Sequence, residues 1–376
     1  MNKREFLKIL GAGAVGLAAN SLIFKSCFLI RKDGQEKHKN WAWITTDLKT
    51  PVDEWKRKFA GMHEAGIHAI LPEIYGSRRA HYASKHLPVD ENWLEMILPA
   101  AKAEGLEIHA WMWCMPCNIE DIQKKHPEWF SVNGKGESSL DKPAYVDYCK
   151  FLCPSRPEVH EFIQMTAAEL AQYETLDGIH LDYIRYPDVI LAEALQPKYG
   201  IVQDREYPEY DYCYCEVCRN KFKEKTGIDP LKLQEPSENK EWRQFRYDSI
   251  TNIVNDKLIP IAHKYNKVIS AAVFPNWEFV RQEWYRWNLD AVMPMLYHSF
   301  YNEDMEWIKK QTEKGVMSLP KNIPLYSGLY VPQLRPDELT EAVEASFDGG
   351  AKGIVLFSAN AMTDAHWKYF SKAVKS

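Results

Sequence analysis

The feature that most constrains the fold of this chain is a regular alternation of eight short apolar segments with longer helical segments. The apolar segments are typical of β-strands because they are rich in β-branched and aromatic residues and end at turn-forming residues. Strands that alternate with helices pair in parallel, and eight such units close a (β/α)8 TIM barrel. The predicted strands are residues 40–47, 68–76, 107–114, 176–187, 267–275, 289–298, 323–331 and 351–360.

Two of the connections between these strands are much longer than a plain loop. The predicted helices are residues 52–65, 91–104, 157–174, 240–264, 302–315 and 335–347. Insertions at 115–156 and 188–239 follow the third and fourth strands, at the end of the strands where barrel enzymes build their active sites. We therefore predict an α/β fold, a TIM barrel with long insertions after the third and fourth strands, as one domain over residues 40–376.

Residues 1–39 are predicted to be an export signal and a linker. Lys3, Arg4 and Lys8 form a basic start, and the small and apolar run 11–24 follows. Lys25 interrupts this run, which argues against a membrane span. Cys27 is either the lipid-anchored residue of a lipoprotein or an incidental cysteine of a cleaved peptide. Both alternatives predict export to the periplasm or cell envelope, with a membrane contact only through Cys27.

The composition excludes several classes of partner. The net charge of -5 gives no reason to expect a nucleic-acid partner. The chain lacks the glycine-rich motifs that bind phosphates or dinucleotides, and we predict no cofactor. In contrast, 13 Trp and 20 Tyr suit a protein that stacks flat apolar faces such as sugar rings against its side chains. No sequence feature fixes the oligomeric state.

The fourth predicted strand, "LDGIHLDYIRYP", carries charged residues in an apolar context. Side chains alternate along a strand, so Ile179 and Leu181 share one face and His180 and Asp182 share the other. Helices cover the outside of a barrel, which places the aliphatic side chains outward and His180 and Asp182 inward. Asp182 lies near the C-terminal end of the strand, where catalytic residues are found. Asp177 lies at its start and is interpreted as structural.

The same alternation predicts further inward side chains near the top of the barrel. A carboxylate pair is what glycoside hydrolysis needs, because one group protonates the leaving oxygen and the other attacks or activates water. We predict Asp182 and Glu73 as this pair, with Glu278 and Glu283 as alternatives to Glu73. The predicted substrate-binding residues are Arg185, Tyr183, His180, His109, Trp111, Trp113 and Tyr297. The competing interpretations are an Asp–Arg ion pair and packed core His and Trp residues, and His180 is expected to orient Asp182.

Eight cysteines leave a second question open. "CYCEVC" contains Cys213, Cys215 and Cys218, and "CMPC" contains Cys114 and Cys117. The C-x2-C spacing is typical of zinc ligands, whereas an oxidising compartment favours disulfides. Either would hold the second insertion in place, and a fourth zinc ligand is not identified. Cys149 and Cys153 are interpreted as packed thiols, and no metal ligand is assigned to the active site.

Several segments together resemble one protein family. "HAWMW", "HPEWF", "FLCPSRPEVHEFI", "LDGIHLDYIRYP" and "DAVMPMLY" occur in an order similar to the bacterial glycosyl hydrolase-like 10 family. The resemblance implies a (β/α)8 barrel in exported proteins that act on polysaccharide, with bacterial cell-wall glycan as a candidate. It also implies a catalytic role for the fourth-strand aspartate, here Asp182, but it does not supply the partner carboxylate. Arg78, Arg79 and His81, in the second loop, either meet an anionic sugar or are solvated.

A second class of glycoside hydrolase, the family 18 chitinases, can be compared with this chain at the fourth strand. Family 18 chitinases read D-G-x-D-x-D-x-E there, and the final Glu is the acid. This chain has Ile184 at that position, which disfavours that mechanism. The sequence therefore predicts an exported glycoside hydrolase with a polysaccharide or oligosaccharide substrate, or else a catalytically inactive carbohydrate-binding barrel. The sugar, the linkage and the stereochemical outcome stay open.

Overall fold

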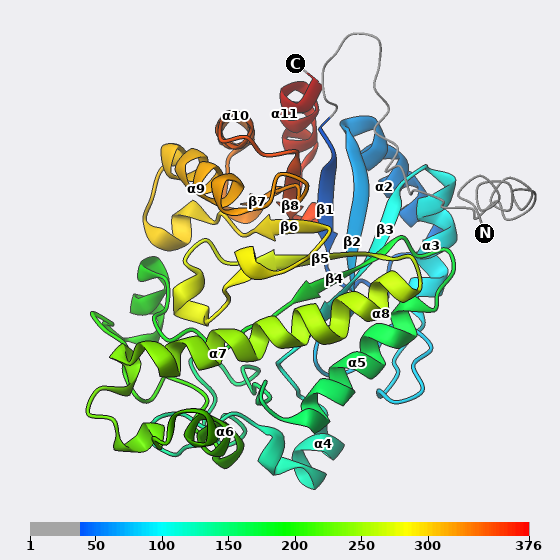
Figure 1. Cartoon of the computed structure of the whole chain (residues 1–376). Coiled ribbons are helices and arrows are strands. Elements are labelled where there is room, and N and C mark those ends of the chain that lie inside the picture. Colours follow the sequence, from blue (N-terminus) through cyan, green and yellow to red (C-terminus); the bar gives the residue numbers. More distant parts are fainter. Residues whose placement is uncertain (1–37, 376) are drawn as a thin grey trace, which may run out of the picture. The chain divides into compact units, whose positions relative to one another are not determined.

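The computed structural model describes residues 38–375, in which eight parallel strands are surrounded by helices (Figure 1). The hydrogen-bonded order is β6-β5-β4-β3-β2-β1-β8-β7, and single bridges between Val292 and Leu325 and between Met295 and Gly328 bring β6 next to β7. The predicted TIM barrel is confirmed, with a nearly closed sheet. The strands are β1 (Asn40–Ile44), β2 (Ile67–Tyr75), β3 (Glu107–Trp113), β4 (Gly178–Asp182), β5 (Val268–Val273), β6 (Ala291–Pro294), β7 (Ser327–Tyr330) and β8 (Ile354–Phe357).

The helices on the outside of the barrel follow the predicted segments closely. A π-helical turn at Val254–Leu258 joins α7 to α8, so the predicted helix 240–264 is continuous. A helix after β8, α11, was not among the predicted ones. These helices are α2 (Val52–Ala65), α3 (Trp93–Ala103), α5 (Pro157–Ala171), α7 (Lys240–Ile253), α8 (Ile259–Lys264), α9 (Met305–Ser318), α10 (Pro336–Asp348) and α11 (Asp364–Lys375).

Strand alternation divides the buried side chains into two sets. Trp41, Trp43, Leu71, Trp111 and Met293 pack with one another inside the barrel. The residues between them in sequence pack outward against the helices, among them Ala42, Ile70, Met112 and Leu181. Since every buried strand residue must face one of these two layers, the period of two fixes which side chains can reach the barrel interior.

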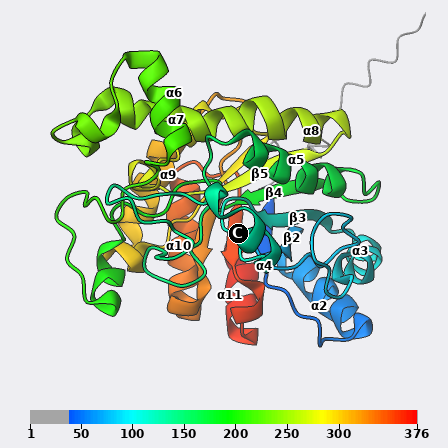
Figure 2. The ribbon, with the colours of Figure 1, turned by 90° about the horizontal axis from the view of Figure 1, so that it is seen from below.

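The two insertions pack against each other and against α7. The first contains the short helix α4 (Glu120–Lys125), and the second contains α6 (Glu216–Thr226). A bridge between Asn133 and Tyr212 joins the insertions. Helix α6 lies beside α7 in Figures 1 and 2. The Phe222 ring of α6 contacts Trp242 of α7, with 5.0 Å between the ring centroids. Both insertions are therefore ordered extensions of the barrel.

The predictions for the N-terminal segment, including the export signal and Cys27, lie outside the described residues. Within residues 38–375, no helix has the length and apolar character needed to cross a lipid bilayer.

Candidate active site

A cavity of about 460 Å³ opens at the C-terminal ends of the strands. All eight strands contribute a side chain at or just beyond their C-terminal ends, as expected for the site of a barrel enzyme. These residues are Thr45, Glu73, Trp111 with Trp113, Asp182, Phe274, Met295, Tyr330 and Phe357. The cavity therefore lies at the mouth of the barrel, where the C-terminal ends of the strands converge, and Glu73 and Asp182 are part of its wall.

Asp182 is the most deeply held carboxyl group of this cavity. Its Oδ2 accepts a hydrogen bond from Trp111 Nε1 at 3.0 Å, and its Oδ1 accepts one from the backbone amide of Tyr183 at 2.6 Å. Burial raises the pKa of Asp182 to about 6, while these two donors and the charge of Arg185 oppose that increase. Asp182 is consequently ionised at neutral pH but close to its titration range.

Glu73 lies two strands away, with Trp111 of β3 between the two acids. The backbone register pairs Glu73 with Trp111, and Trp111 with His180 of β4. Burial raises the pKa of Glu73 to about 7, and the negative charge of Asp182 adds to this increase. No hydrogen bond to its carboxylate is found among residues 38–375. Asp182 has two hydrogen-bond donors that favour its charged form and Glu73 has none among the described residues, so Glu73 is the more readily protonated of the two acids.

A third carboxyl group on the cavity wall, Asp188, is already paired. Its Oδ2 accepts a hydrogen bond from Arg185 at 2.8 Å. The Arg185 guanidinium is buried, donates to the carbonyl of Tyr186, and lies over the rings of Tyr183 and Phe274. Arg185 thus borders the cavity as predicted, but most of its bonding capacity is used within the protein.

Aromatic side chains form most of the remaining wall. Trp113 packs on Tyr183 with 4.3 Å between ring centroids, and its buried indole N–H has no partner among the described residues. Tyr297 contacts both Tyr330 and Phe357 on the other side. Flat apolar surfaces of this kind suit the faces of a sugar ring.

The backbone immediately after Asp182 is in an uncommon conformation. Tyr183 has φ 49°, in the left-handed region that a bulky residue seldom adopts. β4 ends at Asp182, where the chain turns at Tyr183, earlier than the predicted end at 187, and the Tyr183 amide donates to the Asp182 carboxylate. Local backbone strain of this kind often accompanies functional sites.

The two histidines predicted to contact substrate do not line the cavity. Both ring nitrogens of His180 are engaged, by Trp43 Nε1 at 3.0 Å and by Ser270 Oγ at 2.9 Å. Burial lowers the pKa of His180 well below its ordinary value, so the ring is neutral. His180 therefore neither faces the cavity nor hydrogen-bonds Asp182. We correct its role to that of a packing residue of the barrel interior.

His109 lies deeper still. Its ring is fully buried against Trp41 near the N-terminal end of the barrel, and its Nε2 faces Glu107 at 3.2 Å. A Cβ on Gly178 would lie 2.1 Å from His109 Nδ1, so glycine is needed to admit the ring. The inward direction was predicted correctly for both histidines, but their height along the barrel was not. At the same end, Asp177 bonds Lys102 and the amide of Ile108, as its structural interpretation requires.

The alternative partner carboxylates lie away from the cavity. Glu283 is buried in an ion pair with Arg286 and accepts hydrogen bonds from Gln244 and Tyr285. Glu278 is on the short 3-10 turn Trp277–Val280 and does not line the cavity. Arg78, Arg79 and His81 of the second loop do not line it either. Of the candidates named from the sequence, only Glu73 shares the cavity with Asp182.

Sequence analysis missed the wall that the insertions build. Tyr145 and Tyr148 come from the first insertion, and Leu191 and Tyr199 come from the second. Tyr301, from the turn after β6, completes this side. The abundance of tyrosine in both insertions was the available signal, but it did not indicate which tyrosines face inward.

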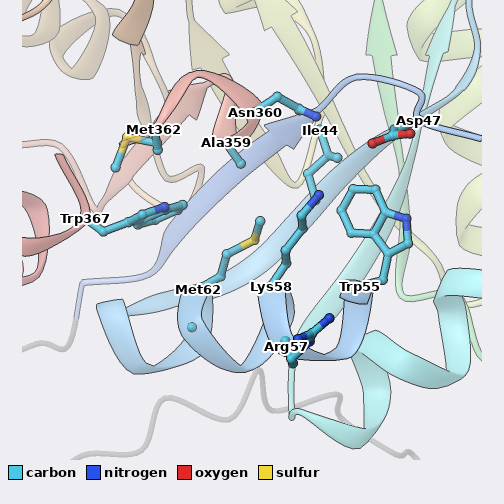
Figure 3. A pocket seen from close by; sticks show the side chains of 11 residues that line it. Ile44, Asp47, Trp55, Arg57, Lys58, Met62, Ala359, Asn360, Met362 and Trp367 are labelled. Carbon is cyan, nitrogen blue, oxygen red and sulfur yellow. The ribbon is translucent and has the colours of Figure 1, made fainter. Parts of the chain in front are cut away.

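A second cavity of about 500 Å³ lies outside the barrel, between α2 and the segment 359–367 (Figure 3). Asp47 is the one acidic residue among its described lining residues, and its carboxylate is bonded by Thr50 Oγ1 at 2.7 Å and the amide of Lys49. Lys58 lies over the ring of Trp55 on another side. This cavity offers no carboxyl pair, so the barrel mouth is the better candidate for a hydrolytic site.

The parallel barrel, with two carboxyl groups in one cavity at its C-terminal end, is a glycosidase-type TIM barrel. Within this class the chain belongs to the Glycosyl hydrolase-like 10 family, which matches residues 67–339. This confirms the resemblance seen in the sequence. No curated protein sequence matches the chain.

Solved structures with a similar fold include glycoside hydrolases of low sequence identity. The catalytic domain of a beta-amylase from Paenibacillus polymyxa has a TM-score of 0.64 at 12% identity, over 89% of this chain and 97% of that one. The glycoside hydrolase domain of PgaB (BpsB) from Bordetella bronchiseptica has a TM-score of 0.64 at 11% identity, over 85% and 94%. A beta-galactosidase from Marinomonas ef1 also has a TM-score of 0.64, at 11% identity over 90% and 59%. At these identities the likeness shows the fold alone.

Proposed function

We propose that this protein is an exported glycoside hydrolase that cleaves glycosidic bonds in a polysaccharide, with Glu73 and Asp182 as its carboxyl pair. One observation carries the proposal: the two acids share one aromatic-walled cavity, and their environments give them different proton affinities. Membership of a glycosyl hydrolase-like family supports the same reaction class.

Glu73 is assigned the role of general acid. Burial raises its pKa to about 7, so the group carries a proton near neutral pH that it can donate to the leaving glycosidic oxygen. Asp182 is assigned the role of the ionised carboxylate, because Trp111 and the Tyr183 amide stabilise its charged form. An ionised Asp182 either attacks the anomeric carbon or activates a water molecule, and it stabilises the positive charge that develops on the sugar.

The substrate is proposed to be a polysaccharide or oligosaccharide, with bacterial cell-wall glycan as the first candidate. The tyrosines of the insertions and Trp113 provide stacking surfaces for consecutive sugar rings. These contacts are expected to orient the glycosidic bond between Glu73 and Asp182.

Export is proposed from the basic and apolar N-terminal segment, residues 1–39. Fractionation of the native host should recover the mature protein outside the cytoplasm, and unprocessed chain in the cytosol would contradict export. If Cys27 carries a lipid, metabolic labelling with palmitate should disappear in Cys27→Ser. Labelling that persists in this variant would exclude Cys27 as the lipid anchor.

The reaction itself is tested by incubating purified protein with a panel of cell-wall and capsular glycans and measuring new reducing ends. Wild type is expected to release oligosaccharides from at least one glycan, and Asp182→Asn is expected to release none above background. A wild type that binds a glycan without cleaving it would overturn the proposal and identify a carbohydrate-binding barrel.

A further inference from the structure

Four cysteine side chains meet in one buried cluster away from the candidate active site. They are Cys153 from the first insertion and Cys213, Cys215 and Cys218 from the second. All four are buried, and their sulfur atoms lie within 4.8 Å of one another. Cys153 Sγ is 3.5 Å from Cys215 Sγ and 3.4 Å from Cys218 Sγ. Cys153, interpreted from the sequence as a packed thiol, is thus buried against three other cysteines.

We infer that this group, the four-cysteine cluster, is a structural zinc site that ties the two insertions together. Four thiolates at Zn–S distances of about 2.3 Å form a tetrahedron whose edges are about 3.8 Å. The observed sulfur separations are close to that edge and far from the ~2.05 Å of a disulfide. Moreover, a disulfide would give each sulfur one near neighbour, whereas here each sulfur has three.

The local backbone is arranged to stabilise thiolates. The amide of Val132 donates to Cys213 Sγ at 3.3 Å. Cys215 is the N-cap of α6 and Cys218 lies in its first turn, where the positive end of the helix dipole favours negative charge. Four coordinated thiolates leave the site with negative charge, and this amide and the helix N-terminus would offset part of it.

Other cysteines serve as internal controls. Cys114 and Cys117 also have a C-x2-C spacing and are buried, but they do not belong to the four-cysteine cluster. Cys114 directly follows β3, and its backbone amide donates to the carbonyl of Asp182, at the end of the neighbouring strand β4. The two C-x2-C motifs therefore have the same spacing, but only Cys215 and Cys218 lie next to Cys153 in the four-cysteine cluster.

The proposed metal holds together two segments that also form the cavity wall. Cys153 lies five residues after Tyr148, and Cys213 follows the part of the second insertion that contains Leu191 and Tyr199. The strand-like contact of Asn133 with Tyr212 brings the two insertions side by side. Loss of the metal should loosen this wall and leave the barrel strands intact.

Elemental analysis of the full chain, purified without chelators, tests the inference. Wild type and Cys117→Ser should each contain about one zinc ion per chain, and Cys215→Ser should contain at least about tenfold less. Hydrogen exchange should increase in residues 140–155 and 188–218 of Cys215→Ser and stay unchanged in the strands. Zinc that stays stoichiometric in Cys215→Ser, or iron in place of zinc, would overturn the assignment.

A measurement on the wild type covers the case in which Cys215→Ser does not fold. Titration with a mercurial reagent should release the zinc into a colorimetric indicator as the thiols react. Alkylation of the unfolded wild type without reductant, followed by mass spectrometry, should modify Cys153, Cys213, Cys215 and Cys218. Wild-type protein without zinc would refute the inference, and the alkylation result would then distinguish disulfides from free thiols.

Discussion

Trp111 donates its indole N–H to Oδ2 of Asp182 at 3.0 Å, across the boundary between neighbouring strands β3 and β4. The strand register sets Trp113 beside Asp182 in the backbone, so the Trp111 ring reaches the carboxylate from the layer below. This bond and the Tyr183 amide hold both Asp182 oxygens in place. Asp182 is therefore an oriented carboxylate, which is what a group acting on one atom of a substrate needs.

Asp182→Asn is expected to lower kcat by at least about a thousandfold while the protein keeps its fold, because the amide preserves shape and removes the negative charge. Circular dichroism and glycan-cleavage rates check this expectation. Glu278→Gln is the matched control, since it neutralises a carboxyl group outside the cavity and should keep wild-type activity. Full activity in Asp182→Asn would remove Asp182 from the mechanism.

Trp111→Phe removes one donor to Asp182 and keeps an aromatic ring. A hydrogen bond to a charged group is worth about 1.5–3 kcal/mol, so the pKa of Asp182 should rise further. We expect the acidic limb of the pH–activity profile to move upward by about 1 pH unit. Trp113→Phe should not move this limb, because the Trp113 N–H does not bond Asp182. Equal acidic limbs in wild type and Trp111→Phe would show that Asp182 does not control the profile.

The pH dependence of cleavage is expected to be bell-shaped. Activity requires ionised Asp182 and protonated Glu73, whose pKa values are about 6 and about 7. Activity should fall as pH drops below the first value and as it rises above the second. Glu73→Gln should lose most activity on substrates with poor leaving groups and lose the alkaline limb on activated substrates. Retention of that limb would transfer the acid role to another group.

The contribution of Glu73 and Asp182 to stability should decrease as pH rises, whereas an ordinary ion-paired carboxylate contributes more as pH rises. Burial raises the pKa of both acids above their ordinary values, so the folded state binds protons more tightly than the unfolded state. Their contribution to stability is complete below about pH 4 and is lost as pH rises through about 6 and 7.

The double variant Glu73→Gln with Asp182→Asn avoids this loss. At pH 8 its free energy of unfolding should exceed that of wild type by roughly 2–3 kcal/mol or more. At pH 4 the free energies of unfolding of the two proteins should be similar. Denaturant titrations at both pH values make the comparison. A wild type that is equally or more stable at pH 8 would show that the acids are not destabilised by burial.

Gly76→Ala should disturb Glu73 without unfolding the barrel. An added Cβ would lie 2.1 Å from Glu73 Oε1, so the carboxyl group must move, and its flexible side chain lets it do so at low cost. We expect cleavage to fall about tenfold to a hundredfold with little change in melting temperature. Gly61→Ala, where the new methyl group meets no atom within 4 Å, is the control and should keep full activity. Wild-type activity in Gly76→Ala would argue that the position of Glu73 is not critical.

Sequence alone determined the fold, because its signals are local. The period-two alternation of 40–44 or 178–182 separates inward from outward side chains without reference to any other strand. It correctly placed Glu73, Trp111 and Asp182 inside the barrel, and the position of Asp182 at a strand end indicated the mouth.

Only the tertiary structure decided which inward or charged groups are free to act. Height along the barrel depends on the stagger between strands, and this is why His109 and His180 are interior residues rather than part of the cavity. Pairing also depends on contacts between distant segments: Gln244, 39 residues away in sequence, bonds Glu283, which Arg286 also holds outside the cavity. For the same reason, the sequence did not indicate which cysteine joins those of "CYCEVC". Cys153 lies 62 residues before Cys215 in sequence and joins the cluster only when the two insertions fold against each other.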